Sequence, residues 1–167
     1  MENDQPRESL GKQGNRPAYR FFLSHNSDDK KLVRDFHAAL AQRGVTAWFD
    51  EKNLPPTEIP VTAIPKGIGE SEVCLVFLGC GGAKAWQSWE IQHAVQRAVD
   101  RKMPIVTISL MGGPEREKRP DLLSIYSWLD FRSGWTDAHI ARLCDEDPSI
   151  SLKPANEACA PVQESSV

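Results

Sequence analysis

The sequence predicts a flavodoxin-like α/β domain: a doubly wound sheet of five parallel strands in the order 2-1-3-4-5, with helices on both faces. Apolar segments of strand length alternate along the chain with segments whose apolar residues recur at helical spacing. The segments within 19–24, 73–78 and 104–110 are also nearly continuous hydrophobic runs. Such runs are typical of parallel strands that are covered on both faces, and right-handed crossovers supply the covering helices.

The first strand and the first helix are predicted from residues 19–44. Tyr19–Ser24 is an apolar run of strand length. Ser27 is expected to cap the following helix, with Asp28 and Asp29 in its first turn, because the helix dipole favours acids there. The helix is expected to end near Gly44. Its apolar stripe consists of Leu32, Val33, Phe36, Ala39 and Leu40.

The next segment contains a second strand and an ambiguous region. Residues 45–49 fit a short strand, and residues 50–58 fit a polar loop that two prolines stiffen. Residues 59–70 carry isoleucines at spacings that suit a short helix, but Pro65 is expected to break it. The sequence leaves both structures open for this region.

The second half of the chain repeats the alternation. Residues 1–17 and 151–167 are polar without periodicity, so we expect a disordered leader and tail around a single domain at 18–150. The remaining expected elements are a third strand at 73–78, a helix that carries Glu90, a fourth strand at 104–110, a fifth at 127–131 and a last helix at 136–145.

Composition excludes several classes of protein. A chain of 167 residues with 40% hydrophobic and 26% charged residues is typical of one globular domain. Its net charge of −3 argues against a general nucleic-acid binder. No apolar run approaches membrane-spanning length, and the polar N-terminus is not a secretory signal. The four cysteines form no CxxC pair, so we expect reduced thiols, a cytoplasmic location and no metal site.

Glu90 is the most informative candidate residue. It lies in the first turns of a helix that follows a buried strand, and ligands of open α/β sheets bind beyond the carboxyl ends of the strands. Trp86 precedes it by four residues, so the two side chains share one helix face. The alternative is an exposed surface Glu90 with Trp86 as a core anchor. Trp48 is expected in the core rather than against a ligand.

Two further groups of polar residues follow strands at the same edge. Ser24, His25 and Asn26 end the first strand, and Asp50 and Lys52 follow the second. The loops that carry them face the crevice at the switch point of the predicted sheet, so these side chains are candidates for ligand binding. The alternatives are a helix cap with its loop and a solvated turn. A phosphate-accepting receiver domain does not fit, because the third strand lacks a terminal Asp.

Taken together, these segments resemble a TIR (Toll/interleukin-1 receptor) domain from about Tyr19 to Trp135. In the bacterial branch of that family, a Trp-x-x-x-Glu motif marks members that cleave NAD⁺, and here this motif is Trp86 to Glu90. Proline pairs and interruptions replace the glycine and the smooth helix that commonly follow the family's second strand. The segments that carry the resemblance are Phe22–His25, Ser27–Asp29, Gly44–Asp50, Asn53–Pro55, Val76–Gly79, Trp86–Ile91 and Pro104–Val106.

The resemblance implies an NAD⁺ glycohydrolase or cyclase that acts in immune-type signalling, antiphage defence or NAD⁺ depletion. It implies NAD⁺ as substrate, no separate cofactor, and a homo-oligomer formed through TIR–TIR contacts, with a sensor or effector protein as a further partner. The alternatives are a non-catalytic TIR interaction module and a nucleoside-processing transferase. The site residues that the resemblance implies are Glu90 as the catalytic group, Ser24, His25 and Asn26 on the floor, Asp50 and Lys52 near the mobile loop, and Trp86 as a wall.

Overall fold

The computed structural model describes residues 17–54, 60–80 and 89–145. They form a five-stranded sheet in the order β2-β1-β3-β4-β5, in which every pair of neighbouring strands is parallel. The predicted fold class and strand order are therefore confirmed. The predicted leader and tail lie almost entirely outside the described residues.

The strands agree with the sequence analysis, although the second is shorter than predicted. Their bounds are Tyr19–Ser24 (β1), Ala47–Trp48 (β2), Ser71–Leu78 (β3), Ile105–Ser109 (β4) and Ser127–Asp130 (β5). β4 is buried at every residue and β3 at all but one, as a parallel sheet covered on both faces requires. The β1–β3 pairing extends from Tyr19–Ser71 to Ser24–Val76, so both strands reach the same edge of the sheet.

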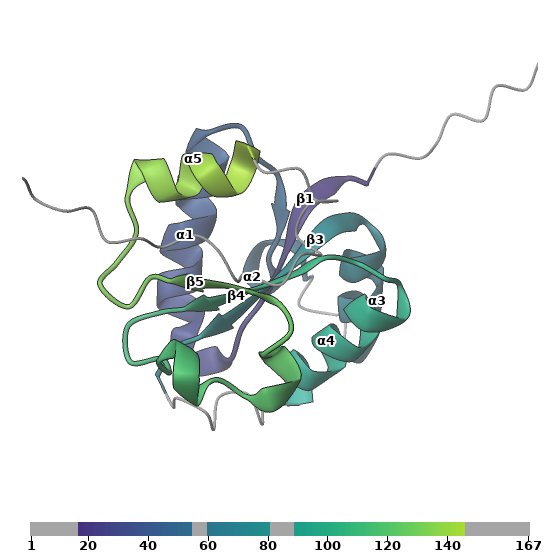
Figure 1. The fold of residues 1–167 in the computed structure, drawn as a ribbon. Coiled ribbons are helices and arrows are strands. Elements are labelled where there is room, and N and C mark those ends of the chain that lie inside the picture. The colour runs from purple at the N-terminus through teal and green to yellow at the C-terminus, as the bar shows by residue number, and fades with distance from the viewer. Residues whose placement is uncertain (1–16, 55–59, 81–88, 146–167) are drawn as a thin grey trace, which may run out of the picture.

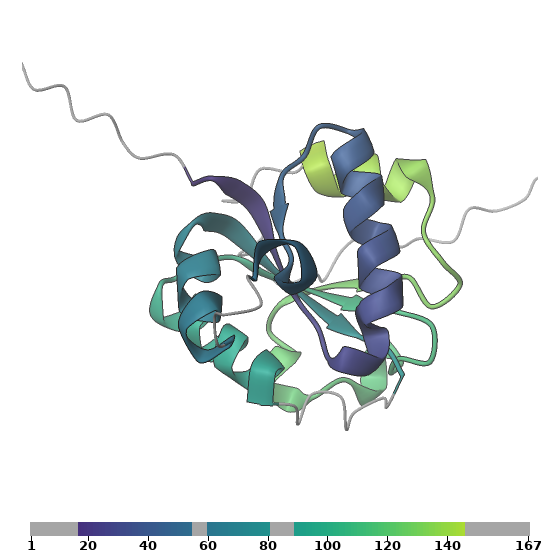
Figure 2. The same ribbon diagram turned by 180° about the vertical axis from the view of Figure 1, so that it is seen from behind.

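Helices cover both faces of the sheet (Figures 1 and 2). α1 and α5 lie on one face, and α3 and α4 lie on the other. None of the described helices is long and apolar enough to cross a bilayer. The helices are α1 (Lys30–Gln42), α2 (Asp50–Asn53), α3 (Pro60–Gly69), α4 (Trp89–Asp100) and α5 (Asp137–Asp145), with 3-10 turns at Ser27–Asp29, Arg116–Lys118 and Asp121–Leu123.

Alternating side chains of β1 separate the core into two layers. Phe21 and Leu23 pack with α1 and α5, whereas Phe22 packs with α3 and α4. Phe36 lies at the centre of the first layer, where it is fully buried. Its ring contacts those of Phe77 and Trp135 edge to face, at centroid distances of 5.1 and 5.3 Å. α1 is thereby held against the sheet directly behind the edge where β1 ends.

The cap of the first helix differs from the prediction. The capping side chain belongs to Asn26 and not to Ser27, because Asn26 Oδ1 accepts a hydrogen bond from the Asp29 backbone N–H at 3.0 Å. A 3-10 turn therefore precedes α1, which begins at Lys30. In this geometry Asp29, which the sequence placed in the first turn of the helix, ends the 3-10 turn and is buried.

One segment predicted as a loop and one that the sequence left open are helical. Residues 50–53 form one helical turn instead of a loop, because Asn53 Oδ1 accepts from the Phe49 N–H and the Leu54 N–H donates to Asp50 O. α3 continues through Pro65, although proline removes one N–H from the helix. Burial of the apolar face, Ile64 and Ile68, against the second core layer outweighs that loss.

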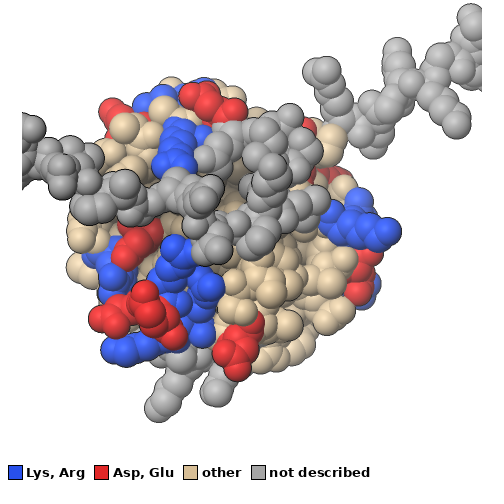
Figure 3. Space-filling view, in the orientation of Figure 1, with Lys and Arg blue, Asp and Glu red and all other residues tan. Residues whose placement is uncertain are grey.

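Charged side chains are interspersed on the surface. In the view of Figure 3, Lys and Arg alternate with Asp and Glu, and no large patch of a single sign is visible. This distribution agrees with the slightly negative net charge of the chain.

The central position of Phe36 leads to a first prediction. Replacement of Phe36 by Ala should lower the free energy of unfolding by about 3–5 kcal/mol, because it leaves a cavity among three aromatic rings. Urea denaturation followed by circular dichroism measures this loss. Lys31→Ala, on the solvent face of the same helix, is the control and should change the stability by about 0.5 kcal/mol or less. A loss below about 1 kcal/mol for Phe36→Ala would contradict the described packing.

Candidate active site

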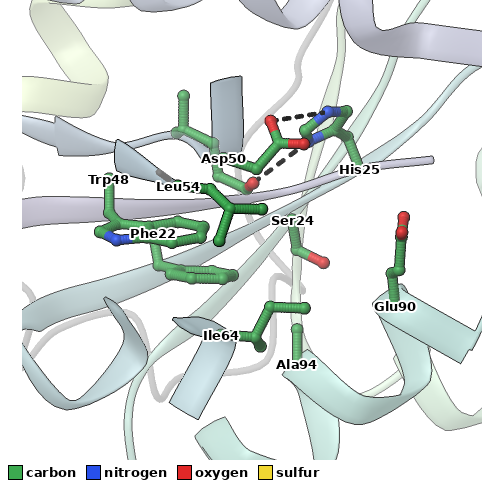
Figure 4. Close-up of a pocket in the computed structure, with 10 residues that line it drawn as sticks. Phe22, Ser24, His25, Trp48, Asp50, Leu54, Ile64, Glu90 and Ala94 are labelled. Atoms are coloured by element: carbon green, nitrogen blue, oxygen red, sulfur yellow. Dashed lines mark hydrogen bonds and ion pairs between the residues drawn. The ribbon is translucent and has the colours of Figure 1, made fainter. Parts of the chain in front are cut away.

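A pocket opens at the carboxyl edge of the sheet, between the ends of β1 and β2 and the helices α3 and α4 (Figure 4). This is the edge at which β1 and β3 diverge to opposite faces, the position where ligands bind in open α/β sheets. The residues that line the pocket are Phe22, Leu23, Ser24, His25, Trp48, Asp50, Leu54, Ile64, Glu90 and Ala94.

One end of the pocket is apolar. Trp48 stacks on Phe22 with a centroid distance of 4.7 Å and an interplanar angle of 12°, and Leu54 and Ile64 complete the wall (Figure 4). The backbone of Gly67 touches the other side of the indole. A Cβ added there would lie 2.5 Å from Trp48 Cε2, well inside van der Waals contact. Because residue 67 is glycine, α3 can approach closely enough to pack against Trp48 in this wall.

The other end is polar, and its centre is His25. His25 is 7% exposed, and its ring tilts against Phe49 at a centroid distance of 5.3 Å. Nδ1 lies 3.3 Å from the carbonyl oxygen of Leu23, a hydrogen bond that requires the proton on Nδ1. Nε2 faces Asp50 Oδ1 at 3.6 Å. The imidazole is thus held by the strand behind it and by the carboxylate beside it.

Asp50 is anchored from two sides. Besides facing His25, it accepts a hydrogen bond from Lys30 Nζ to Oδ2 at 2.9 Å. It is also the first residue of α2, where its Oδ1 accepts from the Glu51 N–H at 2.6 Å. These contacts come from three different segments, so the Asp50 carboxylate has a defined position on the pocket wall rather than that of a freely rotating surface acid.

Glu90 approaches the pocket from the opposite side. It is the second residue of α4, it is exposed, and its carboxylate stands across from His25 and Asp50 in Figure 4. Among the described residues, none forms a hydrogen bond or an ion pair with Glu90 that would hold it away from the pocket. The positive end of the α4 dipole favours a negative charge at this place. The predicted position of Glu90 in the first turn of a helix is confirmed.

Asp29 lies directly behind the polar end of the pocket. Its side chain is completely buried, and it accepts hydrogen bonds from the backbone N–H groups of Gly79 and Cys80. Burial raises the pKa of the Asp29 carboxyl, whereas the bonds from Cys80 and Gly79 and the nearby His25 act in the opposite direction. The two N–H donors thus stabilise the charged form against the unfavourable effect of burial.

The structure brings together four of the seven site residues predicted from the sequence: Ser24, His25, Asp50 and Glu90. Asn26 does not line the pocket, because its side chain caps the turn that precedes α1. Lys52 is exposed on α2, also outside the lining. Trp86 lies outside the described residues.

The apolar wall of the pocket and the contact of Lys30 with Asp50 were not predicted from the sequence. Trp48 was assigned to the core, and it is indeed 5% exposed, but its remaining surface lines the pocket. The sequence signal for this role is the position of Trp48 two residues before Asp50, at the carboxyl end of a strand beside the switch point. Helical spacing alone predicts that Ala94, four residues after Glu90, lies on the same helix face and lines the same pocket.

The pocket therefore combines an apolar wall with two carboxylates on facing sides. This combination suits a ligand with a planar apolar ring, hydroxyl groups and a positive charge near the carboxylates. In the part of the chain that the structure describes, no cluster of three His, Cys, Asp or Glu side chains is arranged to hold a metal ion. Fold and site together define an α/β domain with an acidic ligand pocket at its switch point.

Comparison with known proteins identifies the class. The model of the TIR domain family matches residues 21–144, so the chain belongs to the TIR domain family. This finding confirms the resemblance deduced from the sequence. The chain is 32% identical over 94 residues to the 2' cyclic ADP-D-ribose synthase AbTIR of Acinetobacter baumannii, an alignment that covers 55% of this chain and 35% of that protein.

Two further relatives have similar sequence identities and coverages. The chain is 30% identical over 92 residues to the 2' cyclic ADP-D-ribose synthase BtTIR of Bacteroides thetaiotaomicron, covering 54% of this chain and 32% of that one. It is 31% identical over 87 residues to the NAD(+) hydrolase TcpC of Escherichia coli, an alignment that covers 51% of this chain and 28% of TcpC. The chain thus spans about a third of the length of the relatives it matches.

Solved structures support the fold. A metazoan TIR-STING receptor from C. gigas superposes with a TM-score of 0.63 at 20% identity, over 77% of this chain and 40% of the receptor chain. The TIR domain of the Toll-related receptor TRR-2 from Hydra magnipapillata gives a TM-score of 0.55 at 16% identity, over 75% of this chain and 90% of the TRR-2 chain. At these identities the likeness is one of architecture.

The contact between Gly67 and Trp48 leads to a second prediction. Gly67→Ala should lower the free energy of unfolding by about 1–3 kcal/mol, because the added methyl group collides with the indole. Urea denaturation measures the loss, and tryptophan fluorescence reports the displaced wall.

Gly69→Ala is the matched control in the same helix. Its nearest side-chain atom is Arg101 Nη1 at 3.5 Å, an ordinary contact with a flexible group. Alanine should be neutral there or should stabilise by up to about 1 kcal/mol. Equal stability of the two variants would show that Gly67 is not needed for the close approach.

Proposed function

We propose that this TIR domain cleaves the bond between nicotinamide and ribose in NAD⁺, releasing nicotinamide together with ADP-ribose or a cyclic isomer of ADP-ribose. One observation carries the proposal: Glu90, in the first turn of α4, lines a pocket at the switch point across from Ser24, His25 and Asp50. The names of the three relatives, two cyclic ADP-ribose synthases and an NAD⁺ hydrolase, support it.

The reaction needs little from the protein beyond a well-placed negative charge. When the C–N bond breaks, its electron pair moves to the positively charged pyridinium nitrogen, so neutral nicotinamide leaves without a proton. The positive charge passes to the ribose, as in the transition state of glycoside hydrolysis. Attack on C1′ by water gives ADP-ribose, and attack by a hydroxyl group of the same molecule gives a cyclic product.

In this proposal Glu90 is the catalytic residue. Its ionised carboxylate binds ribose hydroxyl groups and stabilises the charge that develops on the sugar. Its position at the N-terminal turn of α4 favours the charged form. Preorganised groups of this kind lower a barrier by about 3–4 kcal/mol, which corresponds to two or three decades in rate.

The rest of the pocket orients the substrate. The apolar wall of Phe22, Trp48 and Leu54 suits the planar nicotinamide ring. Asp50 and Glu90 attract the cationic end of NAD⁺ and repel its phosphates. We therefore place the nicotinamide ribose inside the pocket and the pyrophosphate toward its mouth. Ser24 supplies a hydroxyl group on the floor for a ribose oxygen.

Three further features of the proposal rest on the family. We infer a cytoplasmic protein that forms homo-oligomers through TIR–TIR contacts and takes part in immune-type signalling such as antiphage defence. A sensor or effector protein is the expected activating partner. Because neighbouring copies can complete a site, activity should rise with protein concentration.

The third prediction tests the role of Glu90. Incubation of concentrated protein with NAD⁺ should release nicotinamide, which chromatography detects. Glu90→Ala and Glu90→Gln should each lower the rate by about a hundredfold or more, since both remove the negative charge. Asp100→Asn is the control, because it neutralises a carboxylate at the other end of the same helix and should leave the rate unchanged.

Two outcomes would contradict the assignment. Full activity in both Glu90 variants would show that this carboxylate is not the catalytic group. No nicotinamide release from the unaltered chain, across a range of protein concentrations and with crowding agents, would favour a non-catalytic interaction module.

A further inference from the structure

Asp29 is a buried charged group that the proposed mechanism does not use. It ends the turn before α1, and its side chain is 0% exposed. Its Oδ2 accepts a hydrogen bond from the Gly79 N–H at 2.9 Å, and its Oδ1 accepts one from the Cys80 N–H at 2.8 Å. These two amides directly follow the last residue of β3. The carboxylate thus crosses from the loop after β1 to the loop after β3.

The partner position is built for this contact. A Cβ added at Gly79 would lie 2.1 Å from Asp29 Oδ1 and 2.6 Å from Asp29 Cγ. Any other residue at position 79 would therefore have to displace the carboxylate or the strand end. Close approach, rather than an unusual backbone angle, is the reason that this position needs glycine.

The contact continues the sheet beyond its last paired residues. The β1–β3 register ends at Ser24 and Val76, after which the two chains separate. Ser24 and His25 line the pocket floor at this point. Asn26, the next residue, holds the backbone of Asp29 through its own side chain at 3.0 Å. Asp29 therefore ties the segment that carries the pocket floor to the end of β3.

Burial of this carboxylate is not, by itself, expected to raise the free energy of unfolding. Removing a charge from water is costly even when hydrogen bonds compensate it, and neutral or apolar replacements of buried charges are often as stable. A carboxylate that accepts two short hydrogen bonds does, however, define the separation of two loops to within a fraction of an ångström. Asp29 ends the turn that follows Ser24 and His25 along the chain, so a shift of this turn should displace residues that line the pocket.

We propose that Asp29 is a positioning residue of the site: it holds the pocket floor, Ser24 and His25, in a fixed place relative to the end of β3, and so relative to the bound ribose. This role rests on the proposed cleavage of NAD⁺. Asp29 itself does not touch the substrate, since it is absent from the pocket lining. Its loss should therefore lower kcat more than it changes KM.

A double-mutant cycle of Asp29→Ala and Gly79→Ala tests the coupling. Each single variant should lower kcat roughly tenfold to a hundredfold, with KM changed by about threefold or less, because misplacement of about 1 Å has effects of this size. In the Asp29→Ala background, Gly79→Ala should lower kcat by about twofold or less, since the atom with which its methyl group collides is gone. Asp28→Ala, at the exposed neighbouring residue, is the control and should keep full activity.

Two measurements separate positioning from a merely structural role. Urea denaturation establishes that each variant is folded at the assay temperature. Amide hydrogen exchange should become roughly tenfold faster at Gly79 and Cys80 in Asp29→Ala, while the amide of Leu75, deep in β3, keeps its protection. Should Asp29→Ala not fold, Asp29→Asn retains one acceptor oxygen and should show an intermediate loss of kcat.

The possible outcomes are distinguishable. Folded Asp29→Ala with the kcat of Asp28→Ala, or unchanged exchange at Gly79 and Cys80, overturns the positioning role while NAD⁺ cleavage by the unaltered chain still stands. A loss of activity that matches only the unfolded fraction overturns it as well. An unaltered chain that releases no nicotinamide overturns the proposed function, and the positioning role with it.

Discussion

The parallel pairing of β1 with β3 is the constraint on which the rest of this structure depends. These strands are neighbours in the sheet, yet α1 leaves from β1 to one face and α4 follows β3 on the other. The chain must therefore separate at their carboxyl ends, and no strand fills the space above that point. The pocket lies there because of topology, before any particular side chain is considered.

Close approach of backbone to side chain shapes this space. Gly67 lets α3 lie against the Trp48 indole, and Gly79 lets the end of β3 lie against the Asp29 carboxylate. One contact sets the apolar wall and the other lies behind the polar floor. At both positions the absence of a Cβ matters more than backbone flexibility. Each end of the pocket is consequently supported by a close contact between buried groups.

The electrostatics of the pocket are asymmetric. Asp50 is restrained by Lys30 and His25, whereas Glu90 stands at the start of a helix and faces the pocket from an exposed position. A restrained carboxylate is suited to orient the substrate, whereas an accessible one is suited to stabilise a developing positive charge. This difference supports the proposal that Glu90, rather than Asp50, is the catalytic residue.

The sequence by itself determined the fold class, the strand order and the edge at which the site lies, because hydrophobic periodicity and strand–helix alternation are local signals with few topological solutions. It also identified Ser24, His25, Asp50 and Glu90, since each directly follows a predicted strand or begins a predicted helix at that edge. It left the structure of residues 59–70 open, and burial of Ile64 and Ile68 makes residues 60–69 a helix despite Pro65. Asn26 was assigned to the floor because a capping side chain and a ligand-binding one look alike in sequence.

Only the tertiary structure decided that Trp48 lines the pocket while packed in the core, that Lys30 contacts Asp50, and that Asp29 is buried between two loops. Each of these facts joins residues that are far apart along the chain. Their contacts depend on separations of a few ångströms between elements, which no local pattern of residue types encodes.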